Sequence, residues 1–249
     1  MEFTDSQVLS LKELSFSRYI SELYEHCRII FPNLIPLFDK ETLNKHFENI
    51  IMSAKTSGYT QRGPVRFYVD MTIMFGTGFE YDPLYYWLKN NIEHELPQLE
   101  KSMAIYLLVE KYCSSAHGMG CVYLKESQAN FKNLDVNGLP SRLIDGDGSL
   151  HKLLNDLYPQ RYSFVGANAV DELIMLSDVH SELYNLNDEV CKTYFIVIMF
   201  LFGVGFDKDF FRSHLIIPPL LSFFNGDKEN SHYKISSIYS CFHFKHDSV

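Results

Sequence analysis

Two copies of one glycine- and aromatic-rich string occur in this chain, FGTGFEYD at residues 75–82 and FGVGFDKD at residues 202–209. The offset between them is 127 residues, and the same offset places Tyr158-Pro159 on Phe31-Pro32. Features that recur together at one fixed spacing are typical of an internal repeat. We therefore predict an all-α fold in which two pseudo-repeated helical units pack as one globular body.

Each string has a mechanical explanation. It follows an apolar run, 67–74 or 194–201, that we expect to be helical. The first glycine then caps the helix, the second lets the chain turn, and the following Phe returns to the core. Asp82-Pro83 is typical of a helix start. The string is not a dinucleotide-binding fingerprint, because its glycines follow a helix and that motif requires a preceding strand.

Apolar residues spaced three to four apart predict several more helices. The expected ranges are about 10–30, 39–58, 64–75, 99–113 and 194–204. Residues 118–149 contain several glycines among polar residues, so we expect a loop or linker there. The predicted organisation is a first helical unit at 1–117, this linker at 118–149, and a second unit with a C-terminal tail at 150–249.

Composition excludes several classes of protein. The chain is 46% hydrophobic and 21% charged, which is typical of a folded domain. Its N-terminal segment lacks the basic and apolar regions of a secretory signal, and the apolar stretch at 194–204 is too short to span a bilayer. A net charge of -9 disfavours nucleic acid as a partner. We expect a cytoplasmic protein with reduced cysteines and no membrane contact.

No catalytic, cofactor or metal motif stands out in the sequence. The calcium-like stretch 133–138 would place Pro140 inside the calcium loop and Ile144 where a carboxylate is needed. The histidines near the C-terminus have no matching ligand spacing. Cys113 and His117 are four residues apart, but a reactive thiolate also needs an electropositive, partly exposed setting. We predict that the protein is not an enzyme, with a hydrolase around this pair as an alternative.

Clustered acids are the candidate contact residues for a protein partner. Acids of the two strings would also line one end of the molecule if the copies packed about a pseudo-twofold axis, among them Asp82 and Asp209. An acidic surface attracts a basic partner over a distance. The residues that we predict to bind a partner are Glu93, Glu95, Glu100, Asp145 and Asp147.

The sequence between residues 15 and 95 resembles helical accessory proteins of bacterial type VI secretion and polymorphic-toxin loci. Three motifs carry the resemblance: CRxxFP at 27–32, AKTSGY at 54–59, and YxxMxxMFGxGFxxDPxxxW at 68–87. It implies an immunity protein that binds and neutralises a cognate effector, or toxin, with a basic surface. An effector chaperone or loading adaptor of the secretion system is the alternative that the same resemblance leaves open.

Overall fold

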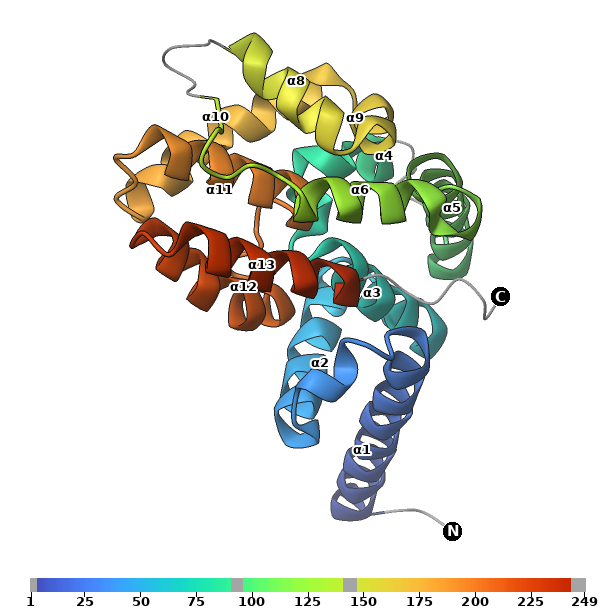
Figure 1. The fold of residues 1–249 in the computed structure, drawn as a ribbon. Coiled ribbons are helices and arrows are strands. Elements are labelled where there is room, and N and C mark those ends of the chain that lie inside the picture. Colours follow the sequence, from blue (N-terminus) through green and yellow to red (C-terminus); the bar gives the residue numbers. More distant parts are fainter. Residues whose placement is uncertain (1–3, 91–95, 141–146, 243–249) are drawn as a thin grey trace. The chain divides into compact units, whose positions relative to one another are not determined.

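A computed structural model describes residues 4–90, 96–140 and 147–242 of the chain, and over these residues the fold is all-α, with no β-strand. The all-α prediction is therefore confirmed, whereas the predicted repeat of whole units stays a prediction. Figure 1 shows the helices in chain order. The α-helices are α1 (Asp5–Ile30), α2 (Lys40–Thr56), α3 (Arg62–Phe75), α4 (Tyr86–Asn90), α5 (Gln98–Tyr112), α6 (Val122–Lys132), α8 (Asp147–Leu157), α9 (Pro159–Val165), α10 (Ala167–Leu183), α11 (Glu189–Phe202), α12 (Phe210–Phe224) and α13 (Lys228–Tyr239).

Contacts within the chain define two compact units, which are described separately: unit 1 holds residues up to Asp70 together with the end of the chain from Cys241, and unit 2 holds residues 71–240. In unit 1, the C-terminal half of α1 packs against α2. The buried residues of these two helices recur at helical spacing, as the sequence predicts. They are Ile20, Leu23 and Cys27 of α1, and Leu43, Phe47, Ile50, Ile51 and Ala54 of α2.

Local capping residues set the ends of both helices in unit 1. Thr4 and Gln7 form a reciprocal capping box, so α1 begins at Asp5, five residues before the predicted start. Asp39 accepts the backbone N–H of Thr42 at the start of α2, and Gly58 takes a positive φ of 85° just beyond its end. Helix bounds in this unit thus follow from side chains close in sequence.

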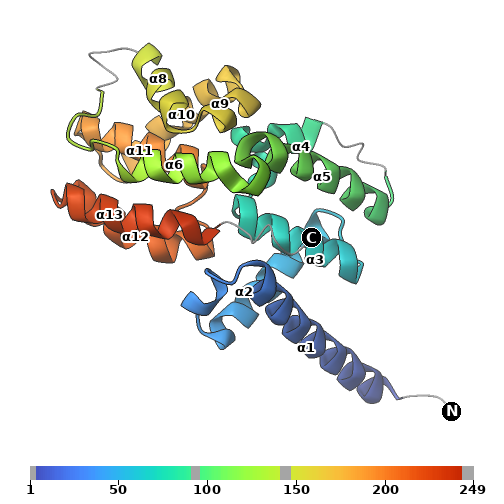
Figure 2. The same ribbon diagram turned by 45° about the vertical axis from the view of Figure 1, so that its right-hand side comes forward.

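Helix α11 forms the core of unit 2. Every residue from Thr193 to Phe202 is buried, because this segment is apolar on all sides and can only be accommodated inside a helical body. Figure 1 shows α11 between α10 and the α12–α13 pair, and Figure 2 shows the same order from a second direction. The rings of Tyr194 in α11 and Phe223 in α12 stack at 3.9 Å between centroids.

The structure adds helices that the sequence pattern did not predict. Helix α6 lies inside the stretch 118–149, where a loop or linker was predicted, and it buries Leu124, Ser127 and Phe131. The chain beyond Pro219, for which no element was predicted, continues α12 to Phe224 and then forms α13. Polar residues outnumber apolar ones along the exposed faces of both segments, and this obscured their helical periodicity.

No helix among the described residues combines the length and the apolar character that crossing a bilayer requires.

Candidate partner-binding surface

The structure places only part of the predicted acidic site. Glu93, Glu95 and Asp145 lie outside the described residues, and Asp147 begins α8 with a side chain that is also outside them. Glu100 lies in the first turn of α5 and is exposed. The structure therefore does not show these five acids together, and their role in binding stays a prediction.

The two repeated strings contact each other directly. The backbone N–H of Thr77 in the first string donates to the carboxylate of Asp209 in the second, at 2.9 Å. The backbone N–H of Val204 in the second string donates to the carboxylate of Asp82 in the first, at 2.8 Å. Thr77 and Val204 occupy the same position in the two strings, so the loops exchange equivalent hydrogen bonds.

Each of these aspartates uses its other oxygen to start a helix. Asp82 accepts the N–H of Leu84, and Asp209 accepts the N–H of Arg212. Asp82 is 7% exposed and Asp209 is fully buried. The expectation that they would line an acidic end of the molecule is therefore wrong, because both carboxylates serve inside the fold as caps.

The Cys113–His117 pair lies in a buried setting. A single π-helical turn, Cys113–His117, carries both residues at the end of α5, and both are buried. Burial raises the pKa of the Cys113 thiol to about 12. A nucleophilic cysteine needs a lowered pKa and access to substrate, so the geometry of this pair does not favour thiolate chemistry.

The calcium-like stretch folds as an ordinary turn. One carboxylate oxygen of Asp135 accepts the backbone N–H groups of Asn137 and Gly138, each at 3.1 Å. This is the local turn geometry that aspartate favours without any ion. Within the described part of the chain, no group of three or more His, Cys, Asp or Glu side chains could hold a metal.

Helix α10 carries an apolar ridge on its outer face. Its inner face buries Val170, Leu173, Ile174, Ser177 and Ser181 in unit 2. On the opposite side Met175, Val179 and Leu183 are 69%, 58% and 65% exposed. Their spacing of four residues lines them up along the helix. Three large, exposed apolar side chains in a row are a feature of binding surfaces.

A polar hollow of about 650 Å³ lies beside this ridge, at the C-terminal end of α10. Asp178 and Glu182 border it from α10, and Lys192 of α11, whose ammonium is 2.8 Å from Glu189, also lines it. Acidic groups therefore predominate around the hollow. We call the ridge and the hollow together the α10 surface; its residues are Met175, Asp178, Val179, Ser181, Glu182, Leu183, Asn185, Leu186, Asn187 and Lys192.

The end of α10 is held by contacts to the second string. His180 lies 3.6 Å from a carboxylate oxygen of Asp207, and the hydroxyl of Tyr184 donates to the same oxygen at 3.4 Å. Burial acts to raise the pKa of Asp207, but the proximity of His180 outweighs it, so the pKa is lowered. These contacts to Asp207 hold the C-terminal end of α10, where the hollow lies.

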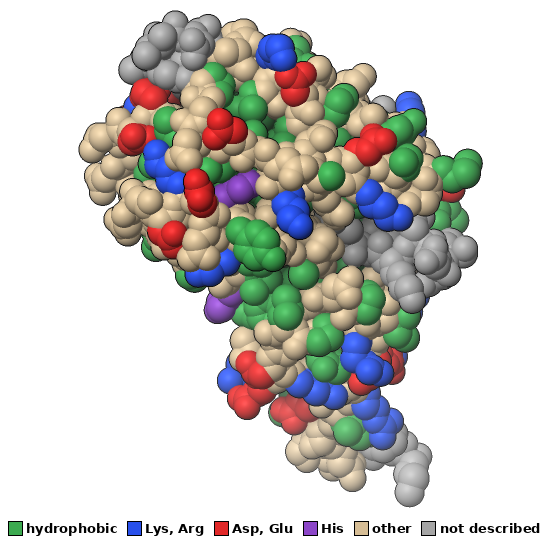
Figure 3. All heavy atoms as spheres, in the orientation of Figure 1, with side chains coloured by type: hydrophobic (Ala, Val, Ile, Leu, Met, Phe, Trp, Pro, Cys, Tyr) green, Lys and Arg blue, Asp and Glu red, His purple; other side chains and the backbone are tan. Residues whose placement is uncertain are grey.

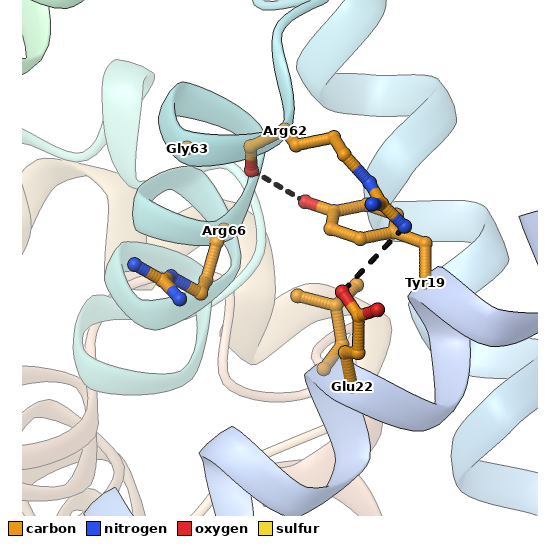
Figure 4. Close-up of a pocket in the computed structure, with 6 residues that line it drawn as sticks. Tyr19, Glu22, Arg62, Gly63 and Arg66 are labelled. Atoms are coloured by element: carbon orange, nitrogen blue, oxygen red, sulfur yellow. Dashed lines mark hydrogen bonds and ion pairs between the residues drawn. The ribbon is translucent and has the colours of Figure 1, made fainter.

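A second, smaller pocket of about 170 Å³ lies in unit 1, between α1 and the start of α3. Figure 4 shows the hydroxyl of Tyr19 pointing to the carbonyl oxygen of Arg62, to which it donates at 2.6 Å, and Glu22 paired with the Arg62 guanidinium at 3.5 Å. Arg66 points away from these groups (Figure 4). Burial raises the pKa of Tyr19 to about 12. These contacts join α1 to α3 and leave little space for a ligand.

Charge is otherwise mixed over the surface that Figure 3 shows, where acidic and basic side chains are interspersed. The α10 surface differs by placing acids next to a continuous apolar ridge. Sequence reasoning missed it, although one signal was present: apolar residues occur on two opposite faces of the segment 167–183. A second apolar face on a helix indicates a second contact, either inside the fold or with a partner.

Comparison of the chain with protein-family models, with curated proteins and with solved structures finds no match. The resemblance to accessory proteins of secretion and toxin loci therefore stays an expectation from the sequence motifs.

Proposed function

We propose that the protein is a non-catalytic binding protein that holds a basic partner protein on its α10 surface. In the form that the sequence resemblance favours, the partner is the toxic domain of a cognate effector, and binding neutralises it. The observation that supports this proposal is the exposed ridge of Met175, Val179 and Leu183 beside an acidic hollow.

The chemistry of this surface fits recognition of a protein. Tight interfaces have an apolar centre from which water is excluded and a polar rim. The ridge offers the apolar centre, while Asp178 and Glu182 offer a rim of negative charge. Acidic rims accelerate association with basic proteins, and this effect weakens as salt rises. Neutralisation by binding needs no catalytic group.

The test is co-expression with each toxin domain encoded by the neighbouring genes, scored by cell survival and by co-purification. The ridge variant is Val179→Lys with Leu183→Lys, and the matched control is Leu99→Lys, which changes an equally exposed leucine on α5. We expect wild type and control to rescue growth and form a complex. We expect the ridge variant to bind at least about 10-fold more weakly, as for loss of a binding hot spot.

Two further variants test which acidic residues contribute to binding of the partner protein. Asp178→Lys with Glu182→Lys is expected to slow association and flatten its salt dependence. Replacing Glu93, Glu95 and Glu100 by Lys tests the acidic patch predicted from the sequence. Wild-type affinity in both α10 variants would contradict the α10 assignment. Complex formation with the delivery domain of the effector, without rescue, would replace the immunity proposal by the chaperone alternative.

A further inference from the structure

The N-terminal half of α1 is a helix with little support from its own unit. No residue from Thr4 to Arg18 is buried, whereas Ile20, Leu23 and Cys27 of the same helix are buried. Figures 1 and 2 both show this half of α1 extending beyond α2. Helical segments of about 12 residues are marginal in water without packing, so a helix projecting in this way gains stability from a partner.

One face of α1 has the spacing of a coiled-coil seam along its whole length. The positions alternate between four and three residues apart, which keeps them on one side of a helix that pairs with another. They are Leu9, Glu13, Phe16, Ile20, Leu23 and Cys27. The last three are covered within unit 1, but Leu9 and Phe16 are 58% and 39% exposed. The described residues therefore leave the exposed half of the seam uncovered.

The exposed half of the seam is complementary to itself in the reverse direction. In the segment LSLKELSF, residues 9–16, Leu9 has its mirror position at Phe16 and Lys12 has its mirror position at Glu13. The same inversion relates Ser10 to Ser15 and Leu11 to Leu14, but helical geometry places these four residues outside the face that carries Leu9 and Phe16. When two such helices lie antiparallel with this face inward, Leu9 meets Phe16 and each Lys12 meets a Glu13.

We infer that the N-terminal half of α1 is a homodimer contact, in which two copies of this chain pair their α1 helices antiparallel about a twofold axis between Lys12 and Glu13. Leu9 of each copy then packs on Phe16 of the other, and Lys12 of each copy pairs with Glu13 of the other. A twofold axis requires that one patch be complementary to itself, which this segment is. A charged residue within a seam also fixes the register and the direction of pairing.

The size of this contact sets its strength. Two helices that overlap over residues 5–20 bury less than the roughly 1,200 Å² typical of stable complexes, which predicts a weak dimer. We expect a dissociation constant on the order of 10 µM. This inference is independent of the proposed function, because it concerns α1 in unit 1 and the α10 surface lies in unit 2.

The experiment is sedimentation velocity of the full chain over a range of concentrations, with charge-reversal variants. In a dimer of the Lys12→Glu variant, each new glutamate faces Glu13 of the other copy. In a dimer of the Glu13→Lys variant, each new lysine faces Lys12 of the other copy. We expect each variant alone to weaken the dimer by at least 10-fold. Arg18→Glu is the control for Lys12→Glu. It makes the same change in charge on the opposite side of α1 and should leave the dimer intact.

Mixing supplies the decisive result. An equimolar mixture of the Lys12→Glu chain and the Glu13→Lys chain restores every opposite-charge pair, and so does the double variant that carries both changes. We expect both to dimerise as strongly as the wild type. A wild-type chain that stays monomeric at 100 µM would overturn the inference, as would variants that dimerise normally. Circular dichroism of each variant checks that the helical fold is retained.

Discussion

At the scale of single residues, the most constrained region is the pair of strings that contact each other. Four charged side chains are buried there: Asp82, Asp209, Arg161 and Arg212. The Arg212 guanidinium lies 3.1 Å from Asp209 and also donates to the carbonyl oxygens of Ile73 and Met74. Two acids and two arginines balance in charge, which is a condition for keeping such groups away from water.

Asp209→Ala should therefore destabilise the protein strongly. The substitution leaves the buried Arg212 charge without its acid and removes the cap of α12, at a cost of about 3–5 kcal/mol. Asp82→Ala should cost less, about 1–2 kcal/mol. It removes equivalent backbone bonds, but Arg161 and Arg212 act on Asp82 only through their charges, without a direct ion pair among the described residues. Urea unfolding measures both, with the exposed neighbour Lys208→Ala as control. Equal losses at the two aspartates would contradict this account of Asp209.

The glycines of the strings allow a second comparison. Gly203 has a φ of 95°, and a Cβ there would lie 3.0 Å from the carboxylate of Asp82 and 3.2 Å from the carbonyl oxygen of Phe75. Gly78 also has a positive φ, of 79°, but a Cβ there would meet open space. Gly78→Ala should cost about 1 kcal/mol through backbone strain alone.

Gly203→Ala should cost at least about 1 kcal/mol more, because a φ of 95° with a ψ of 155° is almost restricted to glycine and a Cβ there is also crowded. Thermal and urea unfolding of the two variants measures this difference, which combines backbone strain and crowding because ψ is 155° at Gly203 and 16° at Gly78. A Gly203→Ala protein as stable as Gly78→Ala would contradict both the backbone strain and the crowding expected at Gly203.

At the scale of elements, the helices divide by how completely they are covered. Helix α11 is surrounded and has almost no exposed surface, whereas α10 and α1 each carry an apolar face that the described part of the chain leaves exposed. The covered helix forms the core of unit 2. The uncovered faces carry the two proposals made above, one for a partner protein and one for a second copy.

The start of α11 provides a prediction about pH. Asp188 caps this helix by accepting the N–H of Cys191 at 2.8 Å, and that backbone hydrogen bond lowers the pKa of Asp188 below its usual value. A lowered carboxyl pKa stabilises the fold above the unfolded-state value of about 3.9, and this contribution is lost as pH falls through the folded-state pKa. Asp188→Ala should therefore cost about 1 kcal/mol at pH 7.

The difference in free energy of unfolding between wild type and Asp188→Ala should shrink below about pH 4, because the carboxylate of Asp188 becomes protonated there. Urea unfolding at a series of pH values between 7 and 3 gives this difference directly. Asp188→Asn is the matched control, because an amide oxygen caps a helix without titrating in this range. A difference that stays constant with pH would contradict a role for the ionised carboxylate.

At the scale of the whole molecule, the two proposed contacts lie in different units. The α10 surface belongs to unit 2 and the exposed half of α1 belongs to unit 1. A dimer formed through α1 would carry two α10 surfaces, and a complex with the partner protein would then contain two copies of each chain. Sedimentation of the complex thus reports on both proposals, while the α1 and α10 variants distinguish them.

The sequence by itself determined the features that depend on neighbours in the chain. The apolar spacing of 10–30, 39–58 and 64–75 predicted helices that the structure contains, and the run at 194–204 identified the most buried one. The glycine and aspartate of each string predicted a cap and a turn, because capping uses residues within four positions of each other.

Only the tertiary structure decided which groups meet across long separations and which faces remain open. Thr77 and Asp209 are bonded although they are 132 residues apart, and Cys113 is buried by helices distant in sequence. The ridge of α10 is as apolar in sequence as a core face; its residues are Met175, Val179 and Leu183. These residues are exposed because no described helix lies over that face of α10. Spacing along a helix specifies that a face is apolar, whereas contacts between helices determine whether water or another chain covers it.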